Sequence, residues 1–199
     1  LRDAGEKPVG DFKLMKDMGV NAIRVYDWQG NKNKELFREL YKKYGIMVVM
    51  GDLLGTYAVG SGVSWYRGTN YADPVQQEKL KARVRKMVET YKNEPYILVW
   101  MLGNETNYGV ANSSKRFPRP FYSFVNEVAK EIHKVDPNHP VVLANAELTD
   151  IDAAVDVTPD IDILGCSIYR GKTFGSFFRE AQSKFKRPVL MTEFGCDRY

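Results

Sequence analysis

The sequence has little cysteine and no long hydrophobic segment, and each shortage excludes a class of protein. Its 199 residues include two cysteines, Cys166 and Cys196, which are too few for a disulfide scaffold. Both lie near strands that we expect to be neighbours, so a bridge between them stays open, and buried free thiols are the favoured interpretation. The longest apolar runs, such as residues 46–50, are far shorter than the ~20 residues of a membrane helix. We therefore predict no membrane span.

Histidine is equally scarce, with only His133 and His139 in the chain. A metal-dependent barrel hydrolase needs several histidine or carboxylate ligands at strand ends, and neither histidine is expected at such a position. A Schiff-base aldolase would need a lysine at a strand end, and the predicted strands supply none. We therefore expect neither a metal-dependent hydrolase nor a Schiff-base aldolase.

The charge is moderate, with a formal net charge of +4 and 27% charged residues. Lysine and arginine are mixed with glutamate on predicted helix faces, without the interleaved aromatic residues of a nucleic-acid platform, so we expect no nucleic-acid partner. At 44% hydrophobic residues, the chain can bury one sizeable core. Because it begins with Leu1 rather than methionine, we expect the true N-terminus to lie upstream. Secretion and a cytoplasmic location are both left open.

Strand-like apolar runs alternate with stretches of helical period, which predicts successive βα units and a parallel sheet. A complete (β/α)8 TIM barrel takes ~250 residues, so we interpret residues 1–199 as a partial TIM-barrel catalytic domain, strands two to seven of a longer chain. A doubly wound open sheet is the alternative, but residues 51–55 do not fit the glycine pattern of a dinucleotide-binding turn. The predicted strands are 21–27, 46–53, 97–102, 141–146, 161–168 and 189–192, and the predicted helices are 10–18, 34–44, 75–91, 120–135, 151–155 and 174–185.

Polar and aromatic residues gather where the predicted strands end. In a TIM barrel these ends converge on one mouth, where the active site lies. Carboxylates, amides and guanidinium groups hydrogen-bond sugar hydroxyls, and aromatic rings stack on sugar faces. We therefore expect a carbohydrate site. Its members are Arg24, Tyr26, Asp27, Trp28, Asp52, Asn104, Glu105, Asn145, Glu147, Tyr169, Arg170 and Glu193.

Two glutamates, Glu105 and Glu193, close two of the most apolar strands. A carboxylate at the end of a buried strand is costly to desolvate, so the pair points to catalysis. Cleavage of a glycosidic bond needs two carboxyl groups, about 5–5.5 Å apart in the retaining version. We predict Glu105 as the acid/base and Glu193 as the nucleophile, with hydrogen bonds from Arg24 or Tyr169 keeping the nucleophile ionised.

The motifs at these residues resemble clan A glycoside hydrolases, most closely glycoside hydrolase family 2. They are Asn21-Ala22-Ile23-Arg24, Trp100-Met101-Leu102-Gly103-Asn104-Glu105 and Leu190-Met191-Thr192-Glu193-Phe194-Gly195. Some likeness to the family 72 β-1,3-glucanosyltransferases lies in Ile23-Arg24-Val25-Tyr26 and Gly195-Cys196. The resemblance implies a retaining mechanism without cofactor, with Asn104 binding substrate and with Arg24 and Tyr169 supporting the nucleophile.

One departure from the family pattern limits what the resemblance implies about the sugar. Many family 2 enzymes carry a Ser-His segment where this chain has Tyr26-Asp27-Trp28, so galactosidase or glucuronidase specificity does not carry over. We expect a β-linked oligo- or polysaccharide as substrate, with hydrolysis, transglycosylation and the oligomeric state left open. Further substrate contacts are predicted at Asp27, Asp52, Asn107, Tyr108, Asn145 and Trp65.

The competing function is a glycan-binding or scaffold barrel that has lost activity. Intact Glu105 and Glu193 argue against it, whereas the missing barrel units keep it open. An incomplete barrel is not expected to be a complete catalyst when isolated.

Overall fold

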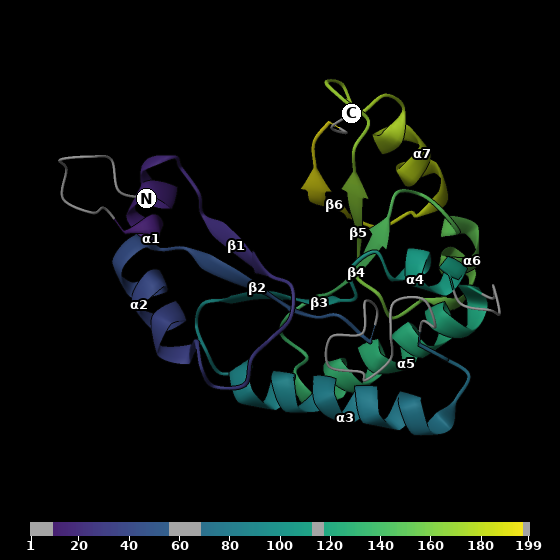
Figure 1. Cartoon of the computed structure of the whole chain (residues 1–199), viewed down its shortest axis with the longest axis horizontal. Helices are drawn as coiled ribbons and strands as arrows, with labels where there is room; N and C mark the ends of the chain where they lie inside the picture. The colour runs from purple at the N-terminus through teal and green to yellow at the C-terminus, as the bar shows by residue number, and fades with distance from the viewer. Residues whose placement is uncertain (1–9, 56–68, 113–117, 197–199) are drawn as a thin grey trace.

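The computed structural model describes residues 10–55, 69–112 and 118–196 and shows six parallel strands in an arc, with helices along the outer side (Figure 1). Neighbours in the sheet are neighbours in the chain, in the order β1-β2-β3-β4-β5-β6. The strands are β1 (Ala22–Val25), β2 (Met47–Asp52), β3 (Ile97–Leu102), β4 (Val141–Ala146), β5 (Ile163–Ile168) and β6 (Val189–Phe194). The prediction of a partial TIM barrel is confirmed.

Seven helices are assigned in the described part of the chain. Helix α3 begins as its sequence predicts, because Asp73 caps it by accepting a hydrogen bond from the Val75 amide at 2.9 Å, next to Pro74. Helix α4, directly after β3, has no counterpart in the predicted elements. The helices are α1 (Asp11–Asp17), α2 (Lys34–Tyr44), α3 (Pro74–Tyr91), α4 (Thr106–Asn112), α5 (Pro118–Val135), α6 (Ile151–Val157) and α7 (Phe177–Lys184). None of them is long and apolar enough to cross a membrane.

Side chains of the strands pack into two separate hydrophobic clusters, one on each face of the sheet. Met50, Trp100 and Leu143 belong to the large core between the sheet and its helices. Residues one position away on the same strands form a smaller cluster on the inner face, namely Val49, Val99, Met101, Val142 and Ala144. The alternation follows from the two-residue period of a strand, and a sheet buried on both faces explains the nearly continuous apolar runs.

Gly165 allows strand β5 to lie close to its neighbours at the small inner-face cluster. A Cβ at this position would lie 2.6 Å from Thr192 Cγ2, 2.9 Å from the Leu143 carbonyl oxygen and 2.9 Å from Val142 Cγ1. Because one of these atoms is backbone, a side chain here would push strand β5 away from its neighbours. Only glycine fits without such a shift.

We therefore expect Gly165→Ala to lower the free energy of unfolding by about 1–3 kcal/mol, the usual cost of overpacking a core. Urea unfolding of the protein measures it. Gly10→Ala is the matched control, since a Cβ there meets no atom within 4 Å, and it should change the stability by less than ~1 kcal/mol. Equal stability of the two variants would contradict the close packing inferred around Gly165.

Candidate active site

Arg24 on strand β1, at one edge of the described sheet, binds side chains from β6, at the other edge, and from the turn after β3. Its Nη1 atom donates to Glu193 Oε1 at 3.0 Å and to the Thr192 carbonyl oxygen at 3.2 Å. Its Nη2 atom donates to Asn104 Oδ1 at 2.9 Å. The Arg24 and Glu193 side chains are only 12% and 19% exposed. One guanidinium thus ties β6 to the turn after β3 across the inner side of the arc.

Glu193 receives a second donor from the end of strand β5. The Tyr169 hydroxyl donates to Glu193 Oε2 at 2.8 Å. That hydrogen bond, together with partial burial, raises the pKa of the Tyr169 phenol to about 12. Both oxygens of the carboxylate therefore accept hydrogen bonds, which stabilise its negative charge.

Glu105 lies in a different environment. Burial raises the pKa of its carboxyl, and the nearby charge of Glu193 raises it further, against smaller opposing effects of a hydrogen bond with Ser167 and of the Arg24 charge. The two glutamates are thus close enough to interact. Their surroundings differ, because two donors bind the Glu193 carboxylate, whereas burial is the largest influence on Glu105.

The turn that carries Glu105 is strained. Glu105 has φ 53°, a left-handed conformation that non-glycine residues adopt at a cost of about 1–3 kcal/mol. Gly103 before it has φ 78°, and a side chain there would collide with the Thr106 hydroxyl. The Glu105 amide donates to the Ala144 carbonyl oxygen at 3.1 Å, which fixes the turn to the end of β4. Such strain, held by neighbouring strands, is typical of functional turns.

Asp27 and Asp52 share one partner, Arg83 on helix α3. Arg83 Nη2 lies 2.6 Å from Asp27 Oδ1, and Arg83 Nε lies 2.6 Å from Asp52 Oδ2. Asp52 is 1% exposed, and its Oδ2 atom also accepts a hydrogen bond from Trp28 Nε1 at 3.0 Å. Burial raises the pKa of Asp52, and the Arg83 charge opposes that effect. We predicted substrate contacts for both aspartates, but these bonds favour a supporting role.

Asn107 and Asn145 are also engaged inside the protein. Asn107 Oδ1 accepts from the Ala146 amide at 2.8 Å, and Asn107 Nδ2 donates to the Ala146 carbonyl oxygen at 3.0 Å. Asn145 accepts from the Tyr122 hydroxyl at 2.8 Å and donates to the Thr149 carbonyl oxygen at 3.0 Å. Both side chains are essentially buried. They brace the turn after β4, so their contacts favour a structural role over the predicted contact with substrate.

Two other predicted contacts have different outcomes. Tyr108 on helix α4 is 40% exposed and stays a predicted substrate contact. Trp65 lies outside the described residues.

Sequence reasoning placed Tyr26, Glu147 and Arg170 at the mouth without assigning their partners, and it did not select Ser167. The Tyr26 ring lies 4.1 Å from the Arg24 guanidinium carbon, and Ser167 lies near enough to Glu105 to lower the pKa of its carboxyl. Arg170 pairs with both carboxylate oxygens of Glu147 at 2.6 and 2.8 Å. A two-residue spacing was available as a signal for Ser167, because it precedes Tyr169 by that interval.

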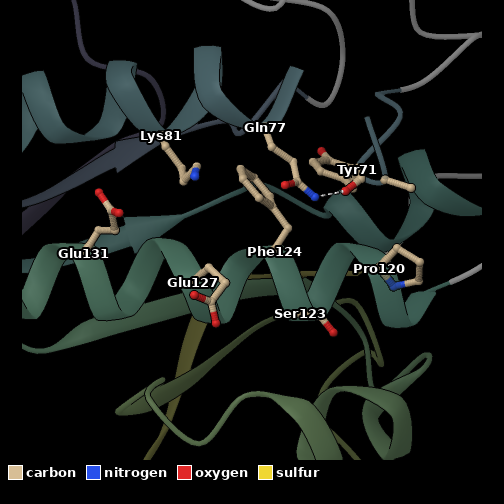
Figure 2. A pocket seen from close by; sticks show the side chains of 9 residues that line it. Tyr71, Gln77, Lys81, Pro120, Ser123, Phe124, Glu127 and Glu131 are labelled. Atoms are coloured by element: carbon tan, nitrogen blue, oxygen red, sulfur yellow. Dashed lines mark hydrogen bonds between the residues drawn. The ribbon is translucent and has the colours of Figure 1, made fainter. Parts of the chain in front are cut away.

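A groove between helices α3 and α5 is a separate feature (Figure 2). Its volume is about 260 Å³, and Gln77 Nε2 within it donates to the Tyr71 carbonyl oxygen at 2.5 Å. Its walls come from the outer helices rather than from the strand ends, so it is distinct from the site around Glu193. No cluster of three or more metal-binding side chains occurs within residues 10–55, 69–112 and 118–196. The groove is lined by Tyr71, Ala72, Gln77, Lys81, Pro120, Ser123, Phe124, Glu127 and Glu131.

Comparison with known proteins relates the chain to one family. Residues 5–199 match the model described as "Glycosyl hydrolases family 2, TIM barrel domain". The chain is 36% identical over 104 residues to a β-galactosidase of Oenococcus oeni, and this match covers 52% of this chain and 9% of the relative. It is 30% identical over 157 residues to a β-galactosidase of Alteromonas mediterranea, covering 77% of this chain and 13% of the relative.

A solved structure agrees at the level of the fold. The crystal structure of Parabacteroides merdae β-glucuronidase with glycerol in its active site superposes with a TM-score of 0.66 and 22% identity. The match covers 92% of this chain and 21% of that chain. The chain thus spans about a tenth of the length of the curated relatives that it matches.

Proposed function

Because the chain belongs to glycosyl hydrolase family 2, whose TIM barrel domain matches residues 5–199, we propose that the protein cleaves β-glycosidic bonds. The proposed reaction is double displacement with retention of configuration, in which Glu105 is the acid/base and Glu193 is the nucleophile. We further propose that residues 1–199 are part of the catalytic barrel. The likeness to family 72 rests on the sequence motifs alone.

The contacts of Arg24 are the observation that carries this proposal. The Arg24 guanidinium binds Glu193 at 3.0 Å and Asn104 at 2.9 Å, and Asn104 is the residue next to Glu105. The charge of Glu193 also raises the pKa of Glu105, which supports a shared site for the two carboxyl groups. Retaining glycosidases need such a close pair, since one group must attack the carbon whose leaving oxygen the other protonates.

In the proposed first step, the Glu193 carboxylate attacks the anomeric carbon and forms a glycosyl ester. The bond to the leaving oxygen breaks as Glu105 donates its proton to that oxygen, and the raised pKa of Glu105 favours the protonated form that this step needs. In the second step, Glu105 removes a proton from the acceptor hydroxyl, which attacks the same carbon and releases Glu193. Two inversions restore the original configuration.

Asn104 and Tyr108 are the proposed substrate contacts of the described mouth. The Asn104 carbonyl is held by Arg24, which leaves its amide nitrogen to bind a sugar hydroxyl. The curated relatives are named β-galactosidases and the similar structure is a β-glucuronidase, which supports a β-glycoside as the substrate class. The chain has Tyr26-Asp27-Trp28 where many family 2 enzymes have a Ser-His segment, which supports a sugar preference other than galactose or glucuronic acid.

The stereochemical course tests the mechanism. The full-length protein should be screened against aryl β-glycosides, and the first product of the best substrate followed by proton NMR before mutarotation. We expect the β anomer to appear first, because two displacements retain configuration. The same substrate without enzyme is the control for spontaneous hydrolysis. An α anomer as the first product would mean inversion and would overturn the double displacement.

A further inference from the structure

The segment after β1, residues 26–28, is fastened to the sheet by the ion pairs of Arg83. One guanidinium binds Asp27 through Nη2 and Asp52 through Nε, each at 2.6 Å. Trp28 adds a hydrogen bond from its ring nitrogen to Asp52 at 3.0 Å. Charge-assisted bonds of this length are among the stronger ones in proteins. Helix α3 thereby fixes the ends of β1 and β2 to each other.

Gly51 allows the segment to lie close against β2. A Cβ at Gly51 would lie 2.5 Å from the Val25 carbonyl oxygen and 2.9 Å from the Tyr26 carbonyl oxygen. The Trp28 amide also donates to the Gly51 carbonyl oxygen at 3.0 Å. The path of the backbone around Tyr26 is therefore set by close contacts on the β2 side as well as by the ion pairs.

Tyr26 itself lies against Arg24. The Tyr26 ring packs on the Arg24 guanidinium, while the neighbouring Asp27 carboxylate binds Arg83 of helix α3. The Arg24 guanidinium carbon lies 4.1 Å from the centre of the Tyr26 ring, within the range of a cation–π contact. The same guanidinium binds Glu193 and Asn104. The Tyr26 ring thus supports the group that joins the two candidate catalytic turns.

We propose that Tyr26 and Arg83 are positioning residues: Arg83 holds the segment 26–28, and the Tyr26 ring keeps Arg24 oriented toward Glu193 and Asn104. The inference deepens the proposed function and rests on it. The long Arg24 side chain has many rotamers, so without this support it loses its orientation. Glu193, which Arg24 binds, is then displaced. A displacement of about 1 Å can cost up to 10²-fold in rate.

The ionisation of Tyr26 gives the inference a signature that does not depend on catalysis. Partial burial raises the pKa of the Tyr26 phenol, the Arg24 charge lowers it, and the proximity of Glu193 raises it. Glu105 raises it slightly as well. Since burial is the largest cause, freeing the segment should lower this pKa toward its ordinary value.

The first experiment compares Arg83→Met with Arg85→Met in the full-length protein. Arg85 lies on the same helix and pairs with Glu131 at 2.6 Å, away from the strand ends, so Arg85→Met controls for loss of an ion-paired arginine from α3. We expect Arg83→Met to lower kcat on an activated aryl β-glycoside about tenfold, Arg83→Lys to recover part of it, and Arg85→Met to retain full kcat. Equal kcat in both methionine variants would overturn the role of Arg83.

Variants of Tyr26 cover the case in which Arg83→Met does not fold. Tyr26 is 44% exposed, so its replacement should leave the fold intact. We expect Tyr26→Ala to lose about tenfold in kcat and Tyr26→Phe, which keeps the ring, to lose less than about threefold. Equal losses in these two variants would overturn the role of the ring.

The second experiment titrates the Tyr26 phenol by ultraviolet absorbance, as the difference between the protein with and without Tyr26→Phe. We expect the ionisation to occur at lower pH in the Arg83→Met background and to stay unchanged in the Arg85→Met background. An unchanged titration with Arg83→Met would overturn the inference that Arg83 holds the segment. This readout does not involve turnover, so its failure is distinguishable from failure of the proposed function, which variants of Glu193 test.

Discussion

Glu193→Ala is expected to reduce kcat/KM on aryl β-glycosides by about 10⁴-fold or more, the scale seen when a catalytic nucleophile is removed. Alanine cannot form the glycosyl ester, and it also leaves the Tyr169 hydroxyl and one Arg24 nitrogen without their carboxylate partner. The measurement is steady-state turnover of the full-length protein on an activated aryl glycoside. Unchanged turnover would overturn the assignment of the nucleophile.

Added azide should give this prediction a chemical signature. In Glu193→Ala, azide fits into the space of the missing carboxylate and attacks the anomeric carbon directly. A single displacement inverts configuration, so we expect an α-glycosyl azide from a β-glycoside. Glu131→Ala is the matched control, because Glu131 pairs with Arg85 on the outer helices and its loss should leave turnover unchanged. A β-glycosyl azide from Glu193→Ala would contradict its role.

The strands and their polar ends could be predicted because burial on both faces leaves a plain signal in the sequence. Strand β3 is almost entirely buried, and its apolar run ends just before Gly103-Asn104-Glu105. Since parallel strands end at the same edge of a sheet, these turns were expected to meet those of β1 and β6. The contacts of Arg24 with Asn104 and Glu193 have that arrangement.

The direction of each polar side chain at a strand end could not be predicted, because it depends on partners from distant segments. Asp52 is covered by Arg83, 31 positions later, and Asn145 is held by Tyr122, 23 positions earlier. Nothing in the local sequence distinguishes these buried residues from exposed Tyr169. Helix α4 was missed for a related reason: its sequence, TNYGVAN, has low helix propensity, so tertiary contacts decide its conformation.

Removal of the Glu105 carboxyl is expected to have the second large effect on turnover. Glu105→Ala should slow substrates with poor leaving groups by about 10²–10⁴-fold, the usual contribution of a general acid, and activated substrates far less in the first displacement. Its raised pKa, due to burial and to the Glu193 charge, keeps the proton in place to higher pH. Activity of the native protein should therefore fall on the basic side as this proton is lost.

In Glu105→Ala the basic limb of the kcat/KM profile should disappear, because no acid remains to titrate. Azide should accelerate turnover of activated substrates by attacking the ester on Glu193, and after two displacements the product is a β-glycosyl azide, the opposite anomer to that from Glu193→Ala. The two variants thus separate the two roles by the configuration of one product. Equal losses on good and poor leaving groups, with no azide product, would contradict the acid/base role of Glu105.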